Sequence, residues 1–221
     1  MPRITVDCIA DLHGHYPKLP GGDLLIVAGD LTGRDTNEQQ RDFIFWLAGP
    51  RGMYKKIVYI AGNHDNFFYD KTRHGVLKTP PEWNIEYLCD SGTEFKGLKI
   101  WGTPWTPWFD GVNPKCKAFM LSEGKLDRKF SLIPEGIDIL ITHGPMHHIL
   151  DTNEDGYACG SSSLRKHIDR VKPRFHIFGH IHEQGGNQLM YKHSGSNTWC
   201  VNCSYVNERY NPVNSYVRIE I

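Results

Sequence analysis

No apolar run in this chain approaches the roughly 20 residues that a membrane-spanning helix needs. The first residues, 1–6, also lack the long apolar stretch of a signal peptide. Neither sign of charge is in excess, because 25 Lys and Arg balance 25 Asp and Glu. Proteins that bind nucleic acid generally through its backbone are usually basic, so we expect no such binding. These absences predict a cytoplasmic protein without a membrane contact.

A second Cys-x-x-Cys motif is also missing. Of the six cysteines only Cys200 and Cys203 have this spacing, and a structural zinc site needs four ligands. We therefore interpret the pair as two strand cysteines. No repeat, low-complexity tract or linker divides the 221 residues, which are too few for two ordinary enzyme domains. The sequence predicts one domain spanning residues 1–221.

Short apolar runs alternate with amphipathic segments along the chain. The runs at residues 4–10, 23–28, 57–61, 98–102, 137–142 and 175–178 predict strands. Residues 36–48 and 162–171 have the apolar spacing of helices, and strands are expected at 188–193, 198–203 and 215–221. Residues 66–134 are less regular. Alternating strands and helices predict an α/β fold with a largely parallel core.

Polar side chains that can bind a metal follow five of the predicted strands. They are Asp11 and His13, Asp30, Asn63, His143, and His180 and His182. The carboxyl ends of parallel strands lie at one edge of a sheet, where ligands collect, so we expect these side chains to converge. Seven side chains are too many for one tetrahedral zinc ion and suit two metals that share a bridging carboxylate.

The residue types of this set indicate its chemistry. Carboxylate, imidazole and amide ligands suit Mn, Fe or Zn better than Mg or Ca. We expect two divalent metal ions, with Mn first and Fe or Zn as alternatives. Only Asp11 and Asp30 are charged, so surplus positive charge remains for hydroxide and an anionic substrate, as in sites that cleave phosphate esters. His64 is not needed as a ligand and is free to contact phosphate or to protonate the leaving group.

Five short motifs occur in one order along the chain. They are D-x-H at residues 11–13, GD at 29–30, GNHD at 62–65, HGP at 143–145 and GHIH at 179–182. In this order they resemble the motifs of the calcineurin-like metallophosphoesterase family. The resemblance implies a four-layer α/β/β/α sandwich with mixed sheets, and a dinuclear metal centre at the strand ends.

The resemblance also assigns ligands to the two metals. The first metal would be held by Asp11, His13, Asp30 and His182. The second would be held by Asp30, Asn63, His143 and His180, so Asp30 bridges the two ions. His64 takes the family's role of general acid or phosphate contact.

The remaining motifs distinguish between branches of the family. Protein phosphatases carry GDxVDRG, whereas this chain has Gly33 and Asp35 where they have Asp and Gly. They also have GNHE, and this chain has Asp65. The segments WGTPWTPWF, FGHIHEQGG and NCS are more similar to the small metallophosphoesterase-domain-containing phosphodiesterases, which hydrolyse phosphodiesters that include cyclic nucleotides. Some animal members replace the residue matching His180 with Gly and lose activity. Since His180 is retained, we expect activity.

The first hypothesis is therefore a phosphodiesterase in which a metal-bridging hydroxide attacks phosphorus and His64 assists the leaving oxygen. The alternatives are a phosphomonoesterase or serine/threonine protein phosphatase of the same fold, a non-catalytic metal-binding scaffold, and, as the weakest, a nuclease. The expected partner is a phosphate-ester substrate, with a nucleotide as one option. A monomer and a homodimer both remain open.

Four further residues could contact substrate or have a purely structural place. Arg34 could bind a substrate phosphate or form a surface ion pair, and His15 could contact substrate or lie in solvent. Trp105 and Trp108 could stack a base or another aromatic group, or pack as core or lid.

Two more positions near the motifs also have two readings. His147 and His148 could edge the site or be surface residues. Asn202 could hydrogen-bond around the site without binding metal.

Overall fold

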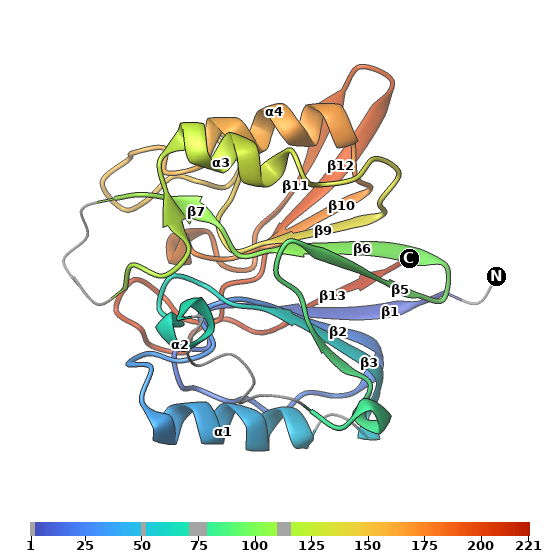
Figure 1. Ribbon diagram of the computed structural model, residues 1–221, viewed down its shortest axis with the longest axis vertical. Helices are drawn as coiled ribbons and strands as arrows, with labels where there is room; N and C mark the ends of the chain where they lie inside the picture. The colour runs from blue at the N-terminus through green and yellow to red at the C-terminus, as the bar shows by residue number, and fades with distance from the viewer. Residues whose placement is uncertain (1–2, 50–51, 71–78, 110–115) are drawn as a thin grey trace.

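Two mixed β-sheets packed face to face form the centre of the molecule (Figure 1). The computed structural model describes residues 3–49, 52–70, 79–109 and 116–221. The first sheet has the order β13 (Val217–Glu220), β1 (Thr5–Ile9), β2 (Gly22–Ala28), β3 (Tyr54–Ile60), β4 (Ile85–Tyr87). The second has the order β11 (Gln188–His193), β12 (Ser196–Asn202), β10 (Phe175–Phe178), β9 (Ile139–Thr142), β6 (Leu98–Thr103), β5 (Ser91–Phe95). A small third sheet pairs β7 (Thr106–Pro107) with β8 (Met120–Leu121).

Helices cover the outer faces of the two large sheets. Helix α1 (Asn37–Ala48) lies along the first sheet, and α3 (Glu123–Phe130) and α4 (Ser162–Val171) lie over the second (Figure 1). Shorter turns are α2 (Asn66–Tyr69), η3 (Pro81–Trp83) and η4 (His182–Gln184). The predicted mixed α/β architecture is confirmed. No helix within the described ranges is both long and apolar enough to cross a bilayer.

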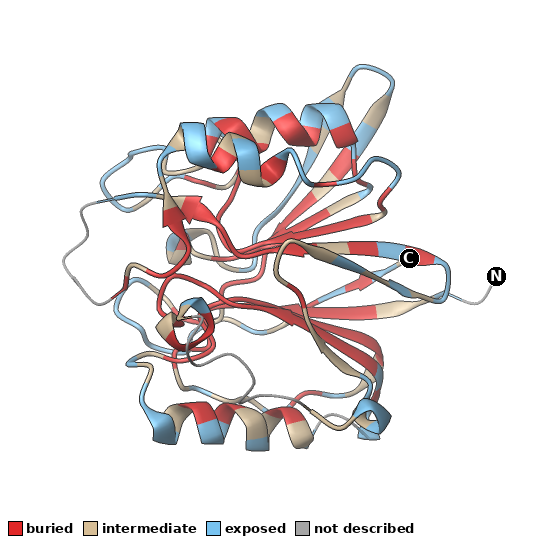
Figure 2. Cartoon of the chain, viewed as in Figure 1, coloured by how far each residue is buried: buried red, intermediate tan, exposed pale blue. Residues whose placement is uncertain are grey.

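The alternation of side chains along each strand builds this layering. In β2, Leu24 and Ile26 belong to the apolar cluster between the sheets, and Leu25 and Val27 belong to the cluster that contains Phe43 of α1. A strand that is buried on both faces needs such a continuous apolar run. Figure 2 shows both consequences, since the central strands β1, β2 and β3 are buried along almost their whole length and α1 is exposed on its outer side.

The strand directions bring the carboxyl ends of both sheets to one edge. Strands β1 to β4 run parallel, and so do β12, β10, β9 and β6, while β13, β11 and β5 are antiparallel. We expected a largely parallel core whose strand ends converge. The structure has this core, but it is divided between two sheets and is not a single sheet. All six cysteines are free thiols, and Cys200 lies in β12 with Cys203 directly after it.

Candidate active site

The seven predicted ligand residues come together where the two sheets meet. Three loops after β1, β2 and β3 contribute one group, and the loops after β9 and β10 contribute the other. The group from the first sheet is Asp11, His13, Asp30 and Asn63, and the group from the second is His143, His180 and His182. All are buried except His180 and His182, which are partly exposed. The site is therefore enclosed on the protein side and open along one face.

Asp30 lies at the centre of this group. Its Oδ2 atom is 3.5 Å from Nε2 of His13, and its Oδ1 atom is 3.4 Å from Nε2 of His143. Nε2 of His143 is also 2.9 Å from Oδ1 of Asn63. The two carboxylate oxygens thus face two different sets of donor atoms.

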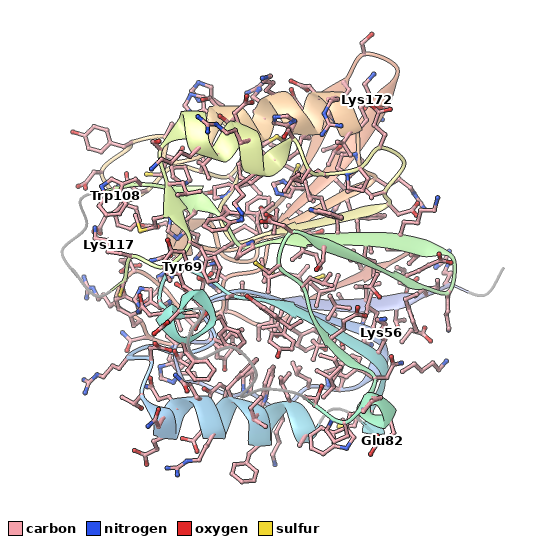
Figure 3. All side chains as sticks on the ribbon, viewed as in Figure 1. Lys56, Tyr69, Glu82, Trp108, Lys117 and Lys172 are labelled. Carbon is pink, nitrogen blue, oxygen red and sulfur yellow. The ribbon has the colours of Figure 1, made fainter. Side chains whose placement is uncertain are left out.

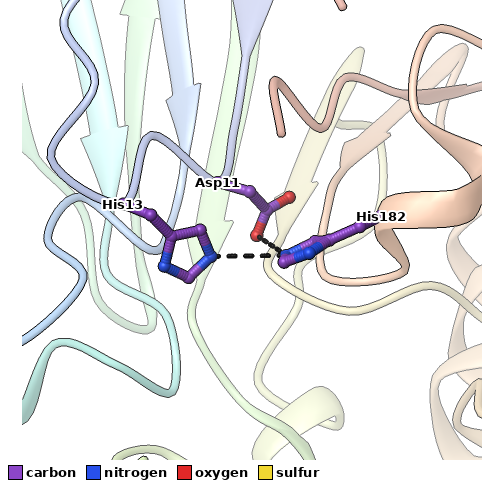
Figure 4. Close-up of side chains that lie close together, drawn as sticks. All are labelled: Asp11, His13 and His182. Carbon is purple, nitrogen blue, oxygen red and sulfur yellow. Dashed lines mark hydrogen bonds and ion pairs between the residues drawn. The ribbon is translucent and has the colours of Figure 1, made fainter. Parts of the chain in front are cut away.

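Asp11, His13 and His182 form a second close group (Figure 4). Nε2 of His182 lies 3.3 Å from Nε2 of His13 and 3.5 Å from Oδ1 of Asp11. Within the described part of the chain, the buried Oδ1 atom of Asp11 accepts no hydrogen bond and only approaches His182 at 3.5 Å. A buried carboxylate oxygen without a partner is costly, and a metal cation among these three atoms would satisfy it. The residues therefore fit a divalent metal ion.

The pKa values of Asp11, His13, Asp30 and His180 suit metal binding. Burial lowers the pKa of His13 and of His180 to about 3, so both imidazoles are neutral near pH 7. Burial alone would raise the pKa of the Asp11 carboxyl, but the adjacent His182 imidazole holds it well below its usual value. Burial opposes ionisation of Asp30 in the same way, and the adjacent His143 imidazole outweighs it, so the pKa of Asp30 is also low. The carboxylates in turn raise the pKa of His143 to about 9 and raise that of His182, so a metal bound to these two imidazoles would displace a proton. Neutral imidazoles and ionised carboxylates are the forms that bind a metal.

Four of the candidate ligand residues share an uncommon backbone conformation. Asp11, His13, Asp30 and His180 all have left-handed backbone conformations, with φ between 44° and 70°. Such conformations are uncommon for residues other than Gly and cluster at functional sites. They turn each side chain inward directly after its strand ends.

Two motif glycines allow the carboxylates to approach the backbone closely. A Cβ atom at Gly62 would lie 2.2 Å from Oδ1 of Asp30, and one at Gly179 would lie 2.2 Å from Oδ2 of Asp11. Both distances are too short for any side chain. The glycines of GNHD and GHIH are therefore required by the positions of Asp30 and Asp11.

Neighbouring residues orient the metal-binding side chains. Ser204 Oγ donates to Oδ2 of Asp11 at 2.6 Å, and Nδ1 of His182 lies 3.1 Å from the carbonyl oxygen of Asn207. Asn202 donates from its side chain to the Ile181 carbonyl at 2.9 Å, which supports its predicted orienting place. Sequence reasoning missed Ser204 and Asn207, because their contacts with the site depend on the fold alone.

Asp65, the last residue of the GNHD motif, has a structural role in the site. Its carboxylate accepts hydrogen bonds from the backbone N–H groups of Leu31, Thr32 and Gly62. It therefore ties the loop that carries Asp30 to the loop that carries Asn63.

His64 lies beside the metal-binding groups. Its Nε2 atom is 3.9 Å from Oδ2 of Asp30, and its ring meets the His13 ring edge-on with centroids 4.5 Å apart. Its Nδ1 atom lies 3.2 Å from the Gly33 carbonyl and 3.1 Å from Sγ of Cys116. Burial raises the pKa of the Cys116 thiol to about 12, so this thiol stays protonated. Because Nδ1 is engaged on the protein side, Nε2 is the atom that faces the site.

A cavity of about 630 Å³ opens from these residues to the surface. Asp30, Asn63, His64, His180 and His182 line its inner part. Its outer part carries the aromatic residues Trp108, Phe109, Tyr157 and Tyr210, and the acidic residues Glu154, Glu183 and Glu208. The cavity therefore has a polar floor, aromatic walls and an acidic rim.

The two tryptophans proposed for substrate contact lie in different environments. Trp108 lines the cavity and is 52% exposed, with Nζ of Lys117 4.8 Å from its ring centre (Figure 3). Trp105 is buried against Phe119, and its indole N–H donates to the Asp90 carboxylate. The structure therefore places Trp105 in the core, where a partner for its N–H is available, and not on the cavity wall.

Arg34 and His15 are not among the described residues that line the cavity. Both are exposed. His15 approaches the carbonyl oxygen of Tyr210 at 3.1 Å. Tyr210 was missed from the sequence, and its ring packs edge-on against His13 and His182 with centroids 4.7 and 5.4 Å away. No motif includes Tyr210, so its place could be found only from the fold.

Replacing Ser204 with Ala tests the support given to Asp11. We expect metal affinity to fall by about 10- to 100-fold, as is common when an outer partner of a metal ligand is removed. Equilibrium dialysis against Mn²⁺ measures this. The exposed Ser131→Ala variant is the control, since the Ser131 hydroxyl donates to the helix carbonyl of Arg128. Equal affinity of Ser204→Ala and the wild type would contradict this role.

Buried Asp and His clusters at the strand ends of a mixed α/β fold are suited to binding divalent metal ions. The chain belongs to the calcineurin-like phosphoesterase family, whose sequence model matches residues 4–184. It is 36% identical to metallophosphoesterase domain-containing protein 1 of Homo sapiens, over 97% of this chain and 70% of that protein. It is 32% identical to a UPF0046 protein of Caenorhabditis elegans, over 97% of this chain and 59% of that one.

Solved structures agree with this assignment at the level of the fold. The crystal structure of TT1561 of Thermus thermophilus superposes with a TM-score of 0.66, covering 98% of each chain. The sequence identity is 13%, so the likeness concerns the fold alone. The family uses divalent metal ions, and the Asp and His clusters described above are the candidate ligands.

Proposed function

We propose that this protein is a phosphodiesterase with a dinuclear metal centre. The observation that carries the proposal is the position of Asp30, whose two oxygens face His13 on one side and His143 on the other. The first metal would be held by Asp11, His13, Asp30 and His182, and the second by Asp30, Asn63, His143 and His180. Mn²⁺ is the proposed metal because the mixed donor set suits it, with Fe or Zn as alternatives.

The chain's own residues have distinct tasks in this proposal. When bound, the metals would supply positive charge against the phosphate oxygens and would acidify a water molecule. Nε2 of His64, directed into the cavity, donates a proton to the leaving oxygen. The contacts of Nδ1 with Gly33 and Cys116 hold the imidazole in that orientation.

The cavity supports a diester over a monoester. Three exposed glutamates line the cavity, of which Glu208 pairs with Arg209 at 3.5 Å, and they disfavour a phosphate monoester, which carries nearly two negative charges near pH 7. A diester carries one negative charge and two organic groups. Trp108, Phe109 and Tyr210 offer aromatic surface to those groups, and an aromatic or nucleoside ester group would stack there.

The assay that tests the proposal compares bis-p-nitrophenyl phosphate with p-nitrophenyl phosphate. The protein is first treated with a chelator, and Mn²⁺ is then added back. We expect no turnover of the chelated protein, recovery with Mn²⁺, and a higher kcat/KM for the diester. A higher kcat/KM for the monoester would favour a phosphomonoesterase or protein phosphatase. Two bound metals without turnover of either ester would favour a scaffold.

A further inference from the structure

A second group of metal-binding side chains lies outside the predicted active site. It consists of His147, His148 and Asp151, in the loop between β9 and α4. Each residue offers one donor atom, and these three atoms all lie within 4.8 Å of one another. The five active-site motifs do not account for any of the three.

The contacts within this group suit a metal ion. Nδ1 of His147 is 3.6 Å from Oδ2 of Asp151, and the two imidazole rings lie against each other at a tilt of 36°, with centroids 3.7 Å apart. Ligand atoms about 2.0–2.1 Å from a tetrahedral zinc ion lie about 3.3 Å from one another. The His147 to Asp151 distance is close to that value, and the donor atom of His148 lies within 4.8 Å of the other two.

The carboxylate is held in place while the imidazoles are accessible. Asp151 is buried, and its Oδ2 atom accepts hydrogen bonds from the backbone N–H groups of His148 and Gly160 at 2.9 and 3.0 Å. The His147 side chain is 34% exposed, and His148 is exposed. One fixed carboxylate and two accessible imidazoles leave the fourth position of a tetrahedral site to water.

We propose that His147, His148 and Asp151 bind a zinc-class divalent ion, separate from the metals at Asp30. Two imidazoles and one carboxylate form a donor set that zinc commonly takes. The backbone carbonyl of Asp151 also accepts from the Cys159 N–H at 2.9 Å, and residues 153–160 contribute to the cavity lining. An ion here would therefore fasten the base of the loop that forms one cavity wall.

Zinc stoichiometry tests this site directly. Wild-type protein and the double variant His147→Gln, His148→Gln are dialysed against a series of zinc concentrations, and bound zinc is measured by elemental analysis. We expect the double variant to bind one zinc fewer per chain at saturation. Thr152→Ala, which changes an exposed neighbour of Asp151, is the matched control and should bind as the wild type does.

Single variants test each ligand. His147→Gln and His148→Gln should each raise the Kd of that one zinc by at least about tenfold, since even outer partners of metal ligands contribute that much. Equal zinc content of the wild type and the double variant at saturation would overturn the proposal. This test does not depend on the number of metals bound at Asp30, because it compares only the difference in bound zinc between the variants and the wild type.

Discussion

Replacing Asp30 with Asn is expected to lower diester turnover by about 100-fold or more. Loss of an outer partner of a metal ligand already costs about 10- to 100-fold, and Asp30 is the residue proposed to bind both metals. Its carboxylate is buried and faces His13 and His143 with different oxygens. An amide keeps the shape of the side chain but removes its charge, so bound metal should fall together with turnover.

The measurement combines elemental analysis of the purified variant with kcat/KM for bis-p-nitrophenyl phosphate. Asp169→Asn provides the control, since that carboxylate lies on α4 and bonds to Tyr191 and His193. Circular dichroism verifies that both variants are folded. A folded Asp30→Asn protein with wild-type metal content and turnover would contradict the proposed bridging role.

Replacing His64 with Gln is expected to reduce kcat by about 10²- to 10⁴-fold for a diester with an alkyl leaving group. The bound metal should stay unchanged, because His64 is not a proposed ligand. The loss should be much smaller for bis-p-nitrophenyl phosphate, since p-nitrophenolate departs without a proton. The ratio of the two losses separates proton donation from simple phosphate contact, which would affect both substrates alike.

His167→Gln is the matched control for this variant. His167 lies on α4 and pairs with Asp127 on α3, away from the cavity lining. It should retain wild-type kcat on both diesters. Equal losses of His64→Gln on the alkyl and the nitrophenyl diester would exclude a role as general acid and leave only phosphate binding.

The strands that carry the site could be predicted from the sequence. Strand β10 and helix α4 match the predicted ranges, because a continuous apolar run and an amphipathic period are local patterns. Thr36 caps the N-terminus of α1, the helix predicted over residues 36–48, and its hydroxyl accepts the Gln39 N–H at 3.2 Å. Each candidate ligand directly follows such a strand, so predicting the strand also predicted the approximate position of the ligand.

Other elements depend on contacts that the sequence does not reveal. Helix α3 was not predicted, because only Leu126 and Phe130 are buried and one such pair is too short a pattern to recognise. The division of the strands into two sheets depends on which strands pair with each other. The apolar runs in the sequence do not indicate this pairing. The segment 66–134, which is the least regular in sequence, includes residues 71–78 and 110–115, which lie outside the described residues.

The outer part of the site was the least predictable. Tyr210 reaches His13 only because the chain after β12 returns across the strand ends. Trp105 and Trp108 are three residues apart in one aromatic segment, yet Asp90 binds the indole of the first and draws it into the core. In an irregular segment, the sequence alone therefore does not show which aromatic residues pack in the core and which line the cavity.

Anomalous X-ray scattering from crystals of the Mn²⁺-loaded protein is the most direct test of the dinuclear centre. The proposal predicts two manganese peaks about 3.5–4 Å apart, one on each side of the Asp30 carboxylate. The first peak should lie among Asp11, His13 and His182, and the second beside Asn63 and His143. A single peak on one side of Asp30, or peaks only elsewhere in the molecule, would contradict it.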